Sequence, residues 1–436
     1  MSDQATAKKP KRIRPELPAG FRDYGPADAI AKQGMIDVMR MTFERFGFDP
    51  LETSSVQRTE VLTGGEEDSG KIIFNVKGSQ EQESESDSSL RFDLTVPLAR
   101  FMAANPDLPK PFKRYQIGTV WRGERPQAGR YREFMQADVD IVGSSSIGAD
   151  AEIAMIIYTV FKSLGFSDFV IRYNNRKLLD QLPRFADFPE KKIWEALRII
   201  DKKDKIGSEG VRKELQKNFI KKVADKILEF LSPDFSPMLQ GDEFSEYEEI
   251  KSILGNTGFD WEKFKLERSL VRGLSYYTGS VFEVILTTVP EIGSVCGGGR
   301  YDDLISQFTG QKIPAVGVSF GVDRLFAAME KLERYLWRKT RTQVLMLRLG
   351  DWTWTFDIGE ELRNAGINTA LYVGDDQTFE GQLAYALKKE IPYVVIYGPN
   401  EAKKSVVAIK NLITREQKEI PRNKLVDYFK KVFPSP

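Results

Sequence analysis

Four short runs that combine arginine with glycine most strongly limit what this chain of 436 residues can fold into. They lie far apart along the chain, at 122–132, 272–279, 297–302 and 317–324. Arginine holds phosphate through paired N–H donors, and glycine lets a backbone approach a ligand closely. No GxGxxG run opens a helix, so a doubly wound nucleotide fold is not indicated. We expect the four runs to converge on one triphosphate site without a Walker loop.

The chain contains no histidine and a single cysteine, Cys296. The missing imidazole excludes Ser-His-Asp triads and histidine-ligated metals, and one cysteine excludes a cysteine-rich zinc module. A lone cysteine also fits a reducing, cytoplasmic compartment. We therefore expect chemistry by carboxylates, arginines, tyrosines and Mg²⁺, with no metal site built from histidine or cysteine.

The charge and hydropathy of the chain limit the classes of partner that we expect. The formal net charge is +1, so nucleic acid would be bound by local patches and not by a global basic field. No apolar stretch approaches the roughly 20 residues of a membrane span, so we expect no membrane partner. Residues 1–17 are basic without an apolar core, which predicts a disordered tail, with contact to RNA as the alternative.

Composition and periodicity divide the rest of the chain. A core in two parts, 18–175 and 263–334, encloses a lysine-rich helical insert at 176–262. The lysines indicate either a solvated face or a surface that faces RNA. A linker at 335–341 then precedes an α/β unit at 342–436, whose alternating strands and helices predict a parallel or mixed sheet.

Within the core, apolar spacing predicts helices at 150–164 and 322–334, and strands at 280–286 and 316–320. Residues 112–143 read as two strands joined by the arginine-rich loop. A further strand pair, 72–76 and 90–94, would flank a mobile Ser/Glu-rich tip, Ser79 to Ser89.

Several polar residues share a strand face in this interpretation. Arg122 and Glu124 lie two apart, which indicates either a ligand grip or a cross-strand salt bridge. Arg324 follows Gly321 at a strand-to-helix junction, where a helix N-terminus already favours anions.

A second set of polar residues suits a cationic or heterocyclic ligand. Asp93 and Thr95 share a face of an expected strand, as do Gln136 and Asp140. Tyr276 and Tyr277 would point to opposite faces, and the alternative is that both are core aromatics. The alternative for the polar set is the solvated face of an antiparallel sheet.

Taken together, the runs resemble the histidyl-tRNA synthetases, a family of class II aminoacyl-tRNA synthetases, from about residue 18 to the C-terminus. Arg122-Gly-Glu124 resembles class motif 2, and Gly321-Val-Asp-Arg324 resembles motif 3. The runs 272–279 and 297–302 resemble two peptides peculiar to the histidine enzymes.

This resemblance implies an α+β fold. An antiparallel six-stranded sheet flanked by helices would carry an inserted helical domain and a C-terminal α/β anticodon-binding domain. It also implies a homodimer that activates L-histidine with ATP to histidyl-adenylate and passes the histidyl group to tRNA-His. Mg²⁺ would bridge the β- and γ-phosphates, and no editing domain would be needed.

The resemblance also assigns roles. Arg122 and Arg272 would grip the α-phosphate as the catalytic pair. The remaining assignments are Glu124 with adenine, Arg324 and Gly321 with ATP, Asp93, Thr95 and Gln136 with the substrate amino group, Asp140, Tyr276 and Tyr277 with the imidazole, and Arg125, Gln127 and Arg130 with the tRNA acceptor end.

Departures from the family pattern indicate a divergent bacterial branch. Ser54, Ser275 and Asp303 stand where proline, aspartate and glycine are usual, and the chain carries Asn174-Asn175-Arg176-Lys177 and Asp201-Lys-Lys-Asp-Lys205. The resemblance to that branch implies a tRNA-His without the extra 5′ guanosine, so the loop Arg125–Arg130 would use different contacts.

Three alternatives stay open at this point. One is a non-catalytic regulatory paralogue that serves ATP phosphoribosyltransferase; such paralogues usually lack the last unit and lose ATP arginines, whereas both are present here. The others are a decayed synthetase core with an RNA-binding or kinase-regulatory role, and a class II synthetase for another amino acid.

Overall fold

The structure is a computed structural model, which describes residues 13–64, 73–78, 87–124, 131–232, 242–255, 257–272, 277–334 and 339–434. Its contacts form two compact units, one centred on Met35–Arg334 and the other on Tyr335–Pro436. No helix within these ranges is both long and apolar enough to cross a membrane.

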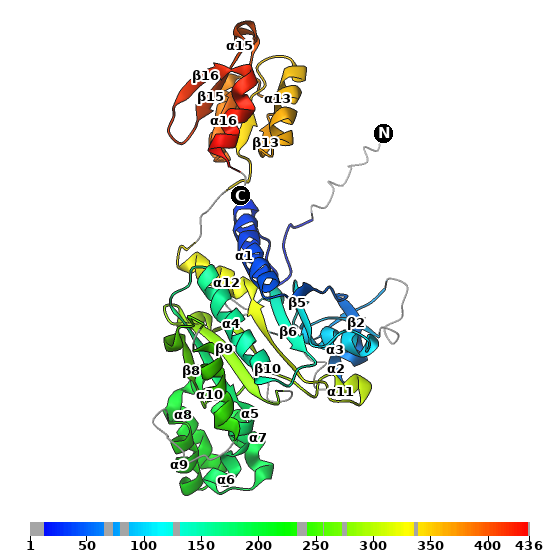
Figure 1. Cartoon of the computed structure of the whole chain (residues 1–436), viewed down its shortest axis with the longest axis vertical. Coiled ribbons are helices and arrows are strands. Elements are labelled where there is room, and N and C mark those ends of the chain that lie inside the picture. Colours follow the sequence, from blue (N-terminus) through cyan, green and yellow to red (C-terminus); the bar gives the residue numbers. More distant parts are fainter. Residues whose placement is uncertain are drawn as a thin grey trace, which may run out of the picture. The chain divides into compact units, whose positions relative to one another are not determined.

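An eight-stranded sheet forms the centre of the first unit, in the order β1-β5-β6-β11-β10-β9-β7-β8 (Figure 1). The six inner strands pair antiparallel with one another, as the resemblance implies. A short parallel strand extends the sheet at each edge. The strands are β1 (Asp49–Pro50), β5 (Phe112–Trp121), β6 (Glu133–Val142), β7 (Phe169–Asn175), β8 (Phe264–Leu266), β9 (Ser280–Leu286), β10 (Ser294–Arg300) and β11 (Ala315–Gly321).

Helices α1 (Pro26–Arg45) and α4 (Ile147–Ser163) cover the same face of this sheet. Their aromatic rings meet on Phe320 of β11, with ring centroids 5.8 Å from Phe43 of α1 and 6.1 Å from Phe161 of α4. The expected apolar stripe of α4 is buried, which confirms the helix predicted at 150–164. Because side chains alternate along a strand, the neighbours of Phe320 point to the opposite face.

Shorter elements complete the first unit. A three-stranded sheet has the order β2-β4-β3 and pairs residues 74–76 with 88–90. The strand expected at 90–94 was wrong in its bounds, because the strand ends at Leu90 and a helix begins at Thr95. Ser88 and Ser89 therefore belong to a strand and not to the expected tip. Residues 79–86 of the expected tip lie outside the described part. The elements are β2 (Val56–Arg58), α2 (Thr59–Thr63), β3 (Phe74–Val76), β4 (Ser88–Leu90), α3 (Thr95–Ala104), α11 (Ser306–Thr309) and α12 (Val322–Lys331).

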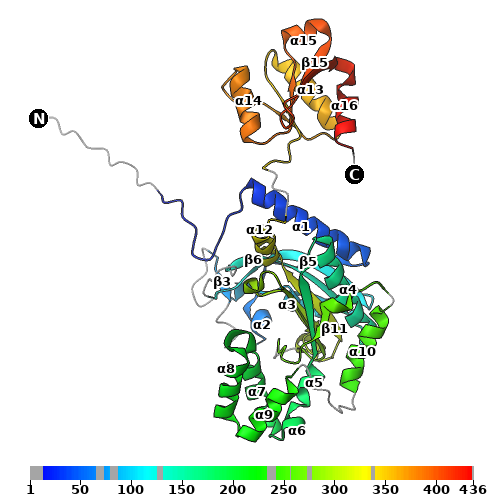
Figure 2. The same ribbon diagram turned by 90° about the vertical axis from the view of Figure 1, so that its left-hand side faces the viewer.

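The helical insert has a hydrophobic core of its own, which extends from Leu178 to Leu231. It contains α5 (Arg176–Asp180), α6 (Leu182–Ala186), α7 (Ile193–Ile200), α8 (Lys203–Asn218) and α9 (Lys221–Phe230), which gather beside one end of the sheet (Figure 2). Helix α10 (Asp242–Leu254) packs instead against α4, and its Tyr247 ring stacks on Tyr173 of β7 and Phe264 of β8. The domain limits 176–262 stay a prediction.

The second unit is a five-stranded mixed sheet in the order β13-β12-β14-β15-β16, with apolar clusters on both faces. Its first three strands are parallel and the last two antiparallel, which agrees with the expected mixed sheet. The elements are β12 (Val344–Met346), α13 (Trp352–Asn364), β13 (Thr369–Leu371), α14 (Phe379–Lys388), β14 (Tyr393–Ile396), α15 (Pro399–Lys404), β15 (Val406–Asn411), β16 (Gln417–Pro421) and α16 (Leu425–Val432).

Three successive glycines, Gly297 to Gly299, allow β10 to lie at the middle of the first sheet. A Cβ on Gly298 would lie 2.1 Å from the carbonyl oxygen of Gly317 and 2.5 Å from the Cα of Val318. A backbone atom cannot move aside as a flexible side chain can, so a side chain here must displace a strand.

We expect Gly298→Ala to destabilise the protein by about 1–3 kcal/mol through overpacking. Gly34→Ala is the matched control, because a Cβ at this exposed position of α1 meets nothing within 4 Å. Thermal unfolding measures both. An unchanged midpoint for Gly298→Ala would contradict the close approach of β10 and β11.

Candidate active site

A cavity of about 430 Å³ opens on the sheet face opposite α1 and α4. Ser319 and Gly321 line it, and Phe320 between them points into the helix layer, as strand alternation requires. The cavity brings together ten residues singled out from the sequence, namely Asp93, Thr95, Arg122, Glu124, Gln136, Asp140, Arg272, Tyr277, Gly321 and Arg324. Tyr276, Arg125, Gln127 and Arg130 lie outside the described residues, so their placement stays a prediction.

Strand β6 supplies one wall of the cavity with Gln136, Asp138 and Asp140, which alternate with buried apolar residues on the helix side. Asp140 Oδ2 lies 2.8 Å from Arg114 Nη2, and the Tyr301 hydroxyl donates to Asp140 Oδ1 at 2.5 Å. Asp140 occupies the space over Gly317 of β11, because a Cβ on that glycine would lie 1.9 Å from Asp140 Oδ1.

Burial dominates the electrostatics of this wall. Loss of water raises the pKa of Asp93 to about 6 and that of Asp138 to about 7, although Arg114 opposes both shifts. Desolvation also raises the pKa of Asp140, against the ion pair with Arg114. The buried oxygens Asp138 Oδ1 and Gln136 Oε1 accept no hydrogen bond from any residue that the structure describes. The wall therefore favours a ligand that carries positive charge and N–H donors.

Three guanidinium groups supply the opposite chemistry. Arg122 Nε donates to the Phe92 carbonyl at 3.0 Å, and its guanidinium lies 5.1 Å from the ring centroid of Phe134. Arg324, in the first turn of α12, donates through Nη1 to the Ser294 carbonyl at 2.7 Å. Arg272 Nε lies 2.6 Å from Glu283 Oε1. All three arginines line the cavity, and such a set suits a polyanion.

Two expectations about local structure were wrong. Strand β5 ends at Trp121, so Arg122 and Glu124 lie just beyond it and not on its face; the Arg122 amide still donates to the Arg132 carbonyl at 2.8 Å. Asp93 and Thr95 do not share a strand, because Thr95 begins α3. Asp93 Oδ1 instead accepts from the Val96 amide at 3.2 Å, in the first turn of that helix.

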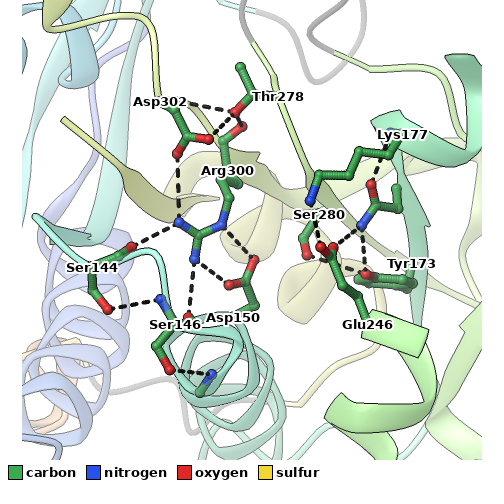
Figure 3. A network of polar contacts seen from close by, with 12 residues as sticks. Ser144, Ser146, Asp150, Tyr173, Lys177, Glu246, Thr278, Ser280, Arg300 and Asp302 are labelled. Atoms are coloured by element: carbon green, nitrogen blue, oxygen red, sulfur yellow. Dashed lines mark hydrogen bonds and ion pairs between the residues drawn. The ribbon is translucent and has the colours of Figure 1, made fainter. Parts of the chain in front are cut away.

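Arg300, the arginine of the run 297–302, lies outside the cavity lining and has a structural role. Its guanidinium donates to the carbonyls of Ser144 and Ser146 and pairs with the buried Asp150 of α4 (Figure 3). Thr278 in turn donates to Asp302 at 2.9 Å. This network joins the end of β10 to the loop before α4 and to the segment after Tyr277.

Sequence reasoning missed Asp138, Arg114, Tyr301 and Asp323. Asp138 could have been predicted from the sequence, because it lies two residues from both Gln136 and Asp140 on one strand and must share their face. Arg114 pairs with Asp140 from the next strand, where the register places the two opposite each other. Among the described residues, no group of three or more carboxylates or thiols is arranged to ligate a metal ion.

We expect Asp138→Asn to make the protein more stable at pH 8 than the parent, and not at pH 4.5. The folded pKa of about 7 exceeds the unfolded value of 3.8. The contribution of this carboxyl to stability is therefore present below about pH 4 and lost as the pH rises through about 7. The gain at pH 8 should be on the order of 1–3 kcal/mol.

Thermal unfolding at both pH values measures this difference, with the exposed Asp225→Asn as control. Identical pH profiles for Asp138→Asn and the parent protein would show that Asp138 is ionised in both states.

Comparison with known proteins agrees with this geometry. The family model for histidyl-tRNA synthetase matches residues 20–325, and that for the anticodon binding domain matches 355–432. A histidine–tRNA ligase of Clostridium tetani (strain Massachusetts / E88) is 39% identical, over 96% of this chain and 98% of its own. Another histidine–tRNA ligase, from Wolinella succinogenes, is 39% identical over 94% of this chain and 97% of its own.

Solved structures agree as well. The crystal structure of histidyl-tRNA synthetase from Nostoc sp. PCC 7120 superposes with a TM-score of 0.86 at 32% identity, covering 97% of this chain and 100% of that one. With a family model over most of its length and close relatives along nearly all of it, this chain belongs to the histidyl-tRNA synthetase family.

Proposed function

We propose that this protein is a histidine–tRNA ligase, an enzyme that activates L-histidine with ATP and transfers it to the 3′ end of tRNA-His. The observation that carries the proposal is a cavity that three guanidinium groups line together with the buried carboxyl groups of Asp138 and Asp140. The regulatory-subunit alternative is not favoured, because the relatives are named as ligases and residues 355–432 match the anticodon binding domain.

In the first step, the carboxylate of histidine attacks the α-phosphorus of ATP. A new P–O bond forms as the bond to pyrophosphate breaks, giving histidyl-adenylate. Such a displacement needs alignment and charge neutralisation more than proton transfer. Arg122 and Arg272 stabilise the charge on the α-phosphate, Arg324 holds the terminal phosphates, and Glu124 meets the adenine amino group.

In the same site, the substrate amino group binds Asp93, Thr95 and Gln136. The imidazole binds Asp140, whose carboxylate is oriented by Arg114 and Tyr301. Tyr277 lines the same cavity, and the family resemblance implies that Tyr276 also contacts the imidazole. A buried site that must bond both ring nitrogens rejects analogues that lack one by up to roughly 10⁴–10⁵, because its polar groups would stay unpaired.

ATP would bind together with Mg²⁺, which would neutralise part of the phosphate charge beside Arg324. In the second step, the 3′ hydroxyl of tRNA-His attacks the acyl carbon, and AMP leaves. Arg125, Gln127 and Arg130 contact the acceptor end. We also propose that the enzyme is a homodimer in the cytoplasm, as the family resemblance implies.

Histidine-dependent ATP–pyrophosphate exchange tests the activity. With each of the twenty amino acids offered separately, we expect exchange with histidine alone, because the other side chains do not present an imidazole N–H to Asp140. Exchange with a different amino acid, or with none, would contradict the proposed function.

We expect Arg272→Ala to reduce the rate of exchange by about 10²–10³-fold, because one donor to the transition-state charge is lost. Histidine binding, measured by calorimetry, should remain detectable. Arg212→Ala, on the exposed side of the insert, serves as the control. Near parental exchange by Arg272→Ala would remove this arginine from the mechanism.

A further inference from the structure

A chain of charged groups connects the helical insert with the cavity. Arg272 Nε lies 2.6 Å from Glu283 Oε1 of β9, and the other oxygen, Glu283 Oε2, accepts from Arg172 Nη1 at 3.4 Å. The same Nη1 donates to Asp204 Oδ2 at 2.9 Å. Asp204 lies in the first turn of α8, within the run Asp201–Lys205 to which the proposed function assigns no role.

The register of the sheet explains why Arg272 lies here. Arg172, Glu283 and Gly297 are directly opposite one another on β7, β9 and β10. A Cβ on Gly297 would lie 2.6 Å from Arg272 Nη1, so the glycine leaves room for the guanidinium above the strand. Gly297 and Glu283 thus fix the position of the Arg272 guanidinium, and Arg172 in turn holds the Glu283 carboxylate.

The segment that leads to Arg272 is held by the insert as well. Lys203 Nζ donates to Ser269 Oγ at 2.8 Å and to Glu267 Oε1 at 3.3 Å. Val271, next to Arg272, is buried in the hydrophobic core of the insert. The positions of Arg272 and of the Glu283 carboxylate therefore both depend on side chains at the start of α8.

We propose that Asp204, Arg172 and Glu283 are positioning residues that fix Arg272 over the cavity and couple the helical insert to adenylate formation. The proposal rests on the proposed function, since it assigns Arg272 to the α-phosphate. The groups act through Arg272 and touch no reacting atom.

A purely structural role predicts a different outcome. The side chain of Asp204 is 69% exposed, and ion pairs at such positions add little to folding stability. Its removal should therefore leave the fold intact while freeing Arg172 and, through Glu283, Arg272. A positioning role shows in the turnover number, and a structural role shows in the unfolding midpoint.

The first test uses the full-length variants Asp204→Asn, Arg172→Gln and Arg172→Lys in histidine-dependent ATP–pyrophosphate exchange. We expect kcat to fall about two- to fivefold in Asp204→Asn and about two- to thirtyfold in Arg172→Gln. The unfolding midpoint and the KM for histidine should stay unchanged in both. Arg172→Lys should recover part of the loss. The double variant Asp204→Asn/Arg172→Gln should be no slower than Arg172→Gln, because the two residues act in series.

The matched control is Asp225→Asn, which removes the 3.2 Å ion pair with Arg212 inside the insert. This variant should keep the parental kcat. The proposal is overturned if Asp204→Asn and Arg172→Gln exchange at the parental rate, if Asp225→Asn slows exchange equally, or if only the KM for histidine changes.

A second measurement needs no activity. Phenylglyoxal modifies guanidinium groups, and peptide mass spectrometry gives a rate for each arginine. Asp204→Asn should raise the modification rate of Arg272 about two- to fivefold, the factor that corresponds to the loss of one exposed ion pair. The modification rate of Arg324 should stay unchanged. An unchanged modification rate of Arg272 would overturn the proposed coupling from Asp204 to Arg272. Absence of histidine-dependent exchange in the parent protein would instead contradict the proposed function.

Discussion

The constraint on which this structure depends is the burial of opposite charges on one face of an antiparallel sheet. Arg114 and Asp140 are almost completely buried, and removing either would leave an uncompensated charge without water. Strand alternation places such groups on the cavity side and aliphatic residues on the helix side. The face that α1 and α4 cover can therefore be apolar, while the other face collects arginines and carboxyl groups within a few strands.

Glycine is the second requirement of this arrangement. Without a side chain, Gly317 leaves room for Asp140, and Gly297 leaves room for Arg272. In each case the missing side chain of one strand is replaced by a charged group from another segment. The glycine runs of the sequence thus mark places where functional groups lie above a strand, and not only places where the backbone bends.

The sequence was sufficient for the fold class, which the family resemblance implies, and for most of the cavity lining, which follows from runs that carry their own chemistry. Gln136 and Asp140 share a face of β6 as alternation requires, and α4 buries the stripe that its spacing indicates. The prediction that Asp93 and Thr95 share a strand was wrong. Residues 93–98 (DLTVPL) alternate in polarity as a strand does, yet Pro97 suits the first turn of a helix. Local pattern alone does not separate the two.

What the sequence did not reveal depends on partners distant along the chain. Arg300 and Arg272 occur in similar runs, yet Arg300 pairs with Asp150 outside the cavity, and Arg272 lies within it. The partners of Arg172 lie 32 and 111 positions away in the chain, and no spacing rule connects them. Sheet register, which only the folded chain supplies, decides which charges meet.

The central claim is that arginines from three separate runs and the carboxyl groups of β6 serve one ligand pair. A crystal structure with a non-hydrolysable histidyl-adenylate analogue tests it most directly. The account predicts the phosphate-mimicking group between Arg122 and Arg272 and the imidazole against Asp140. An analogue bound with its ring away from Asp140, or outside this cavity, would contradict it.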